Sequence, residues 1–181
     1  LEEAKPNPGT LGALMAAYRA SPEFKALADR TKKDYRRIMD WLATIDDMPL
    51  SLITPPFVIA LRDKAFAKHK RRFANYVLTF GRLLFRWGAP RGLVEENPFA
   101  EAPRLRKPHN APKANRAWTL AELKTVLEAA PAGIRVAVAL GAYAGLREGD
   151  ALQLPWSAWD GKTITYKQSK TAQLVELKTH H

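Results

Sequence analysis

The segment 101–116 constrains the fold of this chain more than any other stretch. It contains Pro103, Pro108 and Pro112, five basic residues against one acidic residue, and no apolar periodicity. Such a segment cannot bury a core and is expected to be extended. The 181 residues suffice for two small domains. We therefore predict one domain over residues 1–100, a basic linker over 101–116, and a second domain over 117–181.

Residues 1–100 are predicted to form a bundle of four to five helices, because apolar residues recur there every three or four positions. Thr31 with Asp34 resembles the capping box at the start of one of these helices. Two further helices are predicted over 54–67 and 70–87. The buried stripe of the last helix is predicted to be Phe73, Tyr76, Val77, Phe80, Leu84 and Trp87.

The charge of the chain indicates a polyanionic partner. It carries 29 Lys and Arg residues against 18 Asp and Glu residues, a net charge of +11, and nucleic acids release condensed counterions when cations bind them. Arg and Asn on one face of the helix 70–87 suit base edges in a major groove, although an ordinary solvated face is the alternative. The residues predicted to bind DNA lie on this helix, on an earlier helix and on the linker: Arg72, Asn75, Thr79, Arg82, Arg86; Lys32, Lys33, Arg36, Arg37; Arg104, Arg106 and Lys107.

Residues 117–181 combine helical and strand patterns. Thr119 and Glu122 have the spacing of a capping box. The helix predicted over 132–143 is apolar on almost every side and is therefore expected at the centre of a core. Alternating stretches at 163–166 and 173–177 predict two strands of a hairpin. The chain is thus predicted to be mainly α, a helical bundle followed by the start of an α+β domain with a small antiparallel β-hairpin.

Two cations of this second half stand out. Arg147 lies in a Gly-flanked turn where a helix is expected to begin, and Lys170 lies in the tight turn of the predicted hairpin. Cations on two separate elements suit the binding of a phosphate at which a reaction takes place. The helix dipole disfavours a cation at a helix start, and an anionic ligand would offset that cost.

The order and spacing of the motifs in this half resemble those of the tyrosine recombinases, or phage integrase family. The resemblance implies that residues 1–100 form a SAM-like core-binding domain that closes at Asn97-Pro98. It implies that 117–181 form the N-terminal part of the catalytic domain. The motifs that carry it are Gly145-Leu146-Arg147-Glu148-Gly149-Asp150, Leu154-Pro155-Trp156 and Gln168-Ser169-Lys170-Thr171.

The resemblance also implies roles and partners. Arg147 would contact the scissile phosphate, Asp150 would support the site, and Lys170 would protonate the leaving 5′ oxygen. In this family a Tyr attacks a DNA phosphodiester and forms a 3′-phosphotyrosyl link, with no metal ion or other cofactor. The implied partners are double-stranded DNA and, in the full-length protein, further copies in a tetramer on paired DNA sites. No membrane is implied, and a cytoplasmic, DNA-associated protein of bacterial or phage origin is expected.

The sequence departs from the family pattern after the hairpin. No His-x-x-Arg, further His or Trp, or nucleophilic Tyr follows Lys170, and Tyr166 matches no family role. The chain is therefore predicted to bind DNA without cutting it, as a fragment of a recombinase. The alternatives are a non-catalytic DNA-binding regulator of recombinase descent and a basic helical module for RNA or protein. Helix 132–143 is expected to expose apolar surface if nothing covers it. The Tyr residues predicted to be core are Tyr18, Tyr35, Tyr76 and Tyr143.

Overall fold

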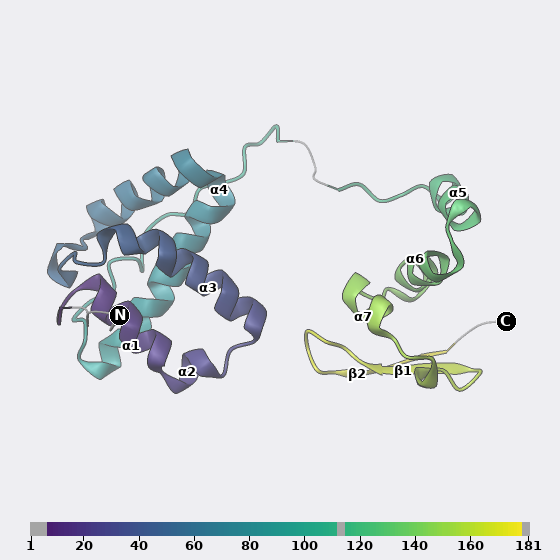
Figure 1. Ribbon diagram of the computed structural model, residues 1–181. Helices are drawn as coiled ribbons and strands as arrows, with labels where there is room; N and C mark the ends of the chain where they lie inside the picture. Colours follow the sequence, from purple (N-terminus) through teal and green to yellow (C-terminus); the bar gives the residue numbers. More distant parts are fainter. Residues whose placement is uncertain (1–6, 112–114, 179–181) are drawn as a thin grey trace. The chain divides into compact units, whose positions relative to one another are not determined.

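The computed structural model describes residues 7–111 and 115–178, and it divides into two compact units, Leu1–Ala111 and Pro112–His181. Over the described residues the fold is mainly α with one two-stranded antiparallel sheet, as predicted (Figure 1).

Unit 1 is a helical bundle (Figure 1). Three of its helices begin at a side-chain cap, because the hydroxyls of Thr10, Ser21 and Thr54 accept hydrogen bonds from the backbone N–H three residues on. Short 3₁₀ turns η1, η2 and η3 cover Ala43–Ile45, Leu50–Leu52 and Ala89–Arg91. The α-helices are α1 (Leu11–Ala20), α2 (Pro22–Lys25), α3 (Asp29–Leu42) and α4 (Pro55–Gly88).

One predicted cap in this bundle is wrong. Helix α3 begins at Asp29, and its N-cap residue Ala28 makes no side-chain cap, so Thr31 lies inside the helix and not before it. Asp34 instead forms an ion pair with Arg30, 3.6 Å away and one helical turn earlier. An i,i+4 ion pair thus occupies the carboxylate that the sequence assigned to a capping box.

The core of unit 1 is aromatic. The Tyr18 ring lies 5.5, 6.2 and 5.2 Å from the ring centroids of Phe24, Phe80 and Trp87, in edge-to-face pairs. Tyr18 and Tyr35 are buried and Tyr76 is half-buried, which confirms them as packing residues. The predicted stripe on α4 also faces this core.

Helix α4 is interrupted where the sequence predicted two helices. Lys70 has φ 67° and ψ 176°, a conformation that breaks the helix between its two halves. Almost only glycine adopts this region, so a lysine there is strained. The second half of α4 packs closely on the chain that follows it. A Cβ on Gly81 would lie 2.4 Å from ring carbons of Phe99, so only glycine fits there.

The described residues of unit 2 form three α-helices and the hairpin, which Figure 1 shows. The helices are α5 (Leu120–Ala129), α6 (Ala132–Ala144) and α7 (Glu148–Gln153), followed by the 3₁₀ turn η4 (Trp156–Ala158). Strands β1 (Thr163–Lys167) and β2 (Leu174–Lys178) pair from Thr163↔Lys178 to Lys167↔Leu174. This is the predicted hairpin, with each strand within a residue or two of its expected position.

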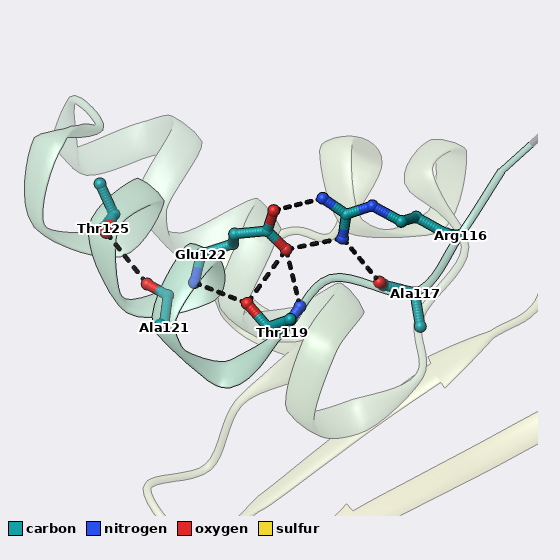
Figure 2. A network of polar contacts seen from close by, with 6 residues as sticks. All are labelled: Arg116, Ala117, Thr119, Ala121, Glu122 and Thr125. Carbon is teal, nitrogen blue, oxygen red and sulfur yellow. Dashed lines mark hydrogen bonds and ion pairs between the residues drawn. The ribbon is translucent and has the colours of Figure 1, made fainter.

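The start of α5 is the predicted capping box, reinforced by an arginine (Figure 2). The Glu122 N–H donates to the Thr119 hydroxyl at 3.2 Å, and the Thr119 N–H donates to the Glu122 carboxylate at 2.8 Å. Nη1 and Nη2 of the Arg116 guanidinium donate to the same carboxylate. The bonds from Arg116 and Thr119 lower the pKa of Glu122 to about 2. Arg116, which the sequence placed in the linker, is therefore part of the α5 cap.

Helix α6 does not lie at the centre of a core, so that prediction is wrong for the part of the chain that the structure describes. None of its residues is buried, and Tyr143, predicted to be a core residue, is 72% exposed. In the described part of unit 2, α6 packs against the short helices α5 and α7. The apolar surface expected of an uncovered helix is present. The exposed large apolar residues of unit 2 are Trp118, Leu120, Ile134, Val136, Tyr143, Leu152, Trp156, Trp159 and Leu174.

Candidate functional site

The first candidate site lies where α6 ends and α7 begins. Gly145 takes the left-handed conformation with φ 67°, and the Leu146 N–H donates to the Leu140 carbonyl at 3.2 Å. The Leu146 side chain is buried. Arg147 follows immediately and is half-exposed at the N-cap of α7. The glycine turn and the buried leucine thus fix the point at which the Arg147 side chain leaves the backbone.

Asp150 joins α7 to the hairpin turn. Its side chain is only 2% exposed, and its Oδ1 accepts a 2.9 Å hydrogen bond from the Ser169 N–H. Its Oδ2 lies 3.7 Å from Nη1 of Arg147. The hydrogen bonds from Ser169, and then the Arg147 cation, lower the pKa of the Asp150 carboxyl below its ordinary value. Asp150 is therefore an anion at neutral pH that holds the turn against the arginine.

Gln168 is a member of this site that residue-by-residue reasoning did not assign. Its Oε1 accepts hydrogen bonds from Arg147 Nη1 at 3.0 Å and from Thr171 Oγ1 at 2.6 Å. Its backbone closes the turn through bonds to Gln173 and Ala172. The sequence shows a carboxamide two residues before Lys170, but only the folded turn shows that this carboxamide contacts Arg147.

Lys170 lies at the exposed tip of the same turn, one residue after Ser169. It makes no hydrogen bond or ion pair with any residue that the structure describes. The structure therefore brings Arg147 and Asp150 together, and it places Lys170 on the turn that Asp150 holds. Gln168 and Asp150 contact only one nitrogen of the Arg147 guanidinium, which has five N–H donors. The arrangement leaves donors and a second cation for an anionic group such as a phosphate.

Three of the five residues on the predicted DNA-reading face of α4 form hydrogen bonds with the chain segment that follows the bundle. Asn75 exchanges two hydrogen bonds with the backbone of Leu105, at 2.9 and 2.8 Å. Arg82 donates to the carbonyls of Phe99, at 2.9 Å, of Ala100, at 3.3 Å, and of Ala102. These side chains bind the chain segment that follows the bundle, so they do not form a free surface for base edges.

The same face also orients an arginine of the predicted linker. Thr79 accepts a 2.7 Å hydrogen bond from Arg104, and Arg62 donates to the Pro103 carbonyl at 2.9 Å. We call residues 97–105 the docked segment. The beginning of the predicted linker is therefore fixed on α4, and the predicted DNA-binding cations of the linker beyond the docked segment are Arg106 and Lys107.

The remaining predicted DNA-binding cations of unit 1 lie on its surface. Lys32 is half-buried and lies 3.5 Å from Asp29, so its charge is partly neutralised. Arg36 and Arg37 lie over the rings of Phe24 and Phe73, at 5.9 and 5.5 Å from the ring centroids. The exposed cations of this set are Lys33, Arg36, Arg37, Arg72, Arg86, Arg104, Arg106 and Lys107.

No group of three His, Asp or Glu side chains within the described residues is arranged to hold a metal ion. None of the helices there combines the length and apolar character that crossing a bilayer requires.

Solved structures of lambda integrase are similar to this chain. The chain is similar to a lambda integrase dimer bound to a COC′ core site, with 22% identity and a TM-score of 0.77 over 96% of this chain and 50% of that one. It is similar to a lambda integrase tetramer bound to a Holliday junction, with 20% identity and a TM-score of 0.78 over 97% and 50%. Residues 75–356 of lambda integrase bound to DNA match with 20% identity and a TM-score of 0.75 over 94% and 60%.

These matches establish the fold of the chain, which is that of lambda integrase. The chain spans about half to three fifths of the length of those integrase chains. Neither the protein-family models nor the curated protein sequences give a match.

Proposed function

We propose that this chain is a DNA-binding part of a site-specific tyrosine recombinase, with unit 1 as the core-binding domain and unit 2 as the first part of the catalytic domain. The observation that carries the proposal is the contact between Arg147, Asp150 and the hairpin turn. It joins the two motifs that resemble the family signature, although about twenty residues separate them. The shared fold with lambda integrase supports the same proposal.

In the proposed reaction the residues of unit 2 act on a DNA phosphodiester. Arg147 donates hydrogen bonds to the non-bridging oxygens and stabilises the charge that builds up on them during attack. A Tyr hydroxyl from outside this chain attacks phosphorus and gives its proton to water, the P–O5′ bond breaks, and Lys170 gives its proton to the 5′ oxygen. Asp150 and Gln168 touch no reacting atom, and they keep Arg147 and the turn in place.

We propose that none of the five tyrosines of this chain is the nucleophile. Tyr18, Tyr35 and Tyr166 are buried, and Tyr76 is half-buried in the aromatic core of unit 1. Tyr143 is exposed on α6, where it belongs to the apolar surface of unit 2. The chain would therefore bind DNA and hold a phosphate without cutting the strand.

Titration of a fluorescent DNA duplex with the full chain, read by anisotropy, tests this function. Arg147→Gln and Lys170→Gln should each weaken duplex binding, whereas Lys124→Gln should not. Lys124 is an exposed cation of α5 that pairs with Glu128 at 3.8 Å, so it controls for the loss of a charge in unit 2. Equal effects of all three substitutions, or tighter binding to RNA than to DNA, would refute the proposal. A covalent complex on a nicked duplex would refute the claim about the tyrosines.

A further inference from the structure

One hollow on unit 1 gathers cations from three separate stretches of the chain. It has a volume of about 470 Å³. Arg37 comes from α3, Arg72 from the second half of α4, and Arg104 from the docked segment. No acidic residue lines it; the other lining residues are His69, Phe73, Asn75, Tyr76 and Thr79.

The guanidinium groups of Arg37 and Arg104 are oriented by neighbouring side chains, and none of the three arginines is neutralised by a described residue. Arg37 lies over the ring of Phe73, and Arg104 donates to Thr79. Neither they nor Arg72 form an ion pair with a residue in the described ranges 7–111 and 115–178. Like charges around one hollow repel one another, and an anion that enters it removes this cost. Planar guanidinium groups match the oxygens of a phosphate through paired hydrogen bonds.

We propose that this hollow, the three-arginine pocket, binds a single backbone phosphate of DNA. The proposal rests on the proposed DNA-binding function and adds to it a site in unit 1, apart from the Arg147 site. It also assigns a role to Asn75. Because Asn75 holds Leu105 by two hydrogen bonds, it fixes the adjacent Arg104 at the pocket, so Asn75 is a positioning residue.

If the three arginines bind one phosphate, the salt dependence of DNA binding should differ from that of three separate phosphate contacts. The slope of log affinity against log salt concentration falls by about 0.9 for each phosphate contact that is lost. Arg37→Gln, Arg72→Gln and Arg104→Gln should each weaken binding of a DNA duplex by about tenfold, the worth of a charge-assisted hydrogen bond. The triple variant should reduce the slope by about 0.9, and three independent contacts would reduce it by about 2.7.

The experiment is a set of anisotropy titrations of the full chain with one duplex over a range of salt concentrations. Arg19→Gln is the matched control, because Arg19 is an exposed cation of α1 outside the pocket. A double-mutant cycle of Asn75→Ala with Arg104→Gln tests the positioning role. The two effects should be strongly non-additive, since either change removes the same guanidinium from the pocket. Additive effects would overturn the role of Asn75.

The outcomes separate the two proposals. A wild-type chain that does not bind the duplex contradicts the proposed function. If the wild type binds the duplex, unchanged affinity in the three single variants overturns the pocket. A slope reduced by about 2.7 in the triple variant also overturns it. Inorganic phosphate is the second probe, since it has the same chemistry without DNA. It should raise the melting temperature of the wild type, at ionic strength matched with chloride, and not that of the triple variant. Strong stabilisation by free phosphate without any effect of the variants on DNA binding would assign the pocket to a free anion instead.

Discussion

Replacing Arg82 by Met should destabilise unit 1 and leave the DNA contacts of the folded chain intact. Met keeps most of the apolar stem and removes the guanidinium, which donates to three carbonyls of the docked segment. The carbonyl of Ala100 is exposed and can bind water, whereas those of Phe99 and Ala102 are partly buried. Two lost charge-assisted bonds of about 1.5 kcal/mol each give an expected loss of about 3 kcal/mol in the free energy of unfolding. That is a large share of the roughly 5–15 kcal/mol of a typical domain.

Arg86→Met is the matched comparison, because Arg86 lies one helical turn further along α4 and is exposed. Its substitution should change stability by less than about 0.5 kcal/mol. Hydrogen exchange of the α4 amides in increasing urea measures unit 1 separately from unit 2. Equal stabilities of the two variants would show that Arg82 does not hold the docked segment, and would return it to the DNA-reading face that the sequence suggested.

Four further substitutions test local features of the fold. Gly81→Ala should cost about 1–3 kcal/mol, because its Cβ would overlap the Phe99 ring. Gly133→Ala, a helical glycine with open space around it, should stabilise by about 0.5–1 kcal/mol, and thermal unfolding of both variants checks the pair. Lys70→Gly should raise the melting temperature by relieving backbone strain of about 1–3 kcal/mol, and a lower melting temperature would contradict a strained lysine. Asp150 has a lowered pKa in the folded chain, so its contribution is complete above the ordinary Asp pKa and is lost as the pH falls through the lowered value. Asp150→Asn should therefore flatten the loss of hairpin stability below about pH 4, and an unchanged acid profile in amide exchange of the turn would count against this role.

The helices and the hairpin of this chain were predictable because their signals are local. Apolar spacing located the helices, and the capping-box pair Thr119 and Glu122 marked the start of α5. The predicted capping box at Thr31 was wrong because a carboxylate within a helix can pair with another side chain. Asp34 forms an ion pair with Arg30. The motif pair around Arg147 and the hairpin turn was likewise predictable, since each half is a short continuous stretch.

The polar face of α4 could not be assigned from its sequence. Arg72 and Arg82 have the same residue type and lie on one face, but only Arg82 has carbonyls of the docked segment within reach. Those carbonyls come from residues about twenty positions further along, and no local pattern reports such a contact. The prediction that α6 is buried was wrong for a related reason. The apolar residues of a helix indicate that it must pack against other segments, but they do not indicate which segments are present. Tyr143 is accordingly exposed.

The most direct test of the central claim is methylphosphonate interference on a duplex selected from a random pool by binding to this chain. Each neutral methylphosphonate removes the charge of one phosphate, so the profile of lost affinity locates every phosphate that the chain grips. We expect Arg147→Gln to erase the interference at one phosphate and to leave the rest of the profile as in the wild type. An unchanged profile would show that Arg147 holds no phosphate, and the proposed recombinase site would be contradicted.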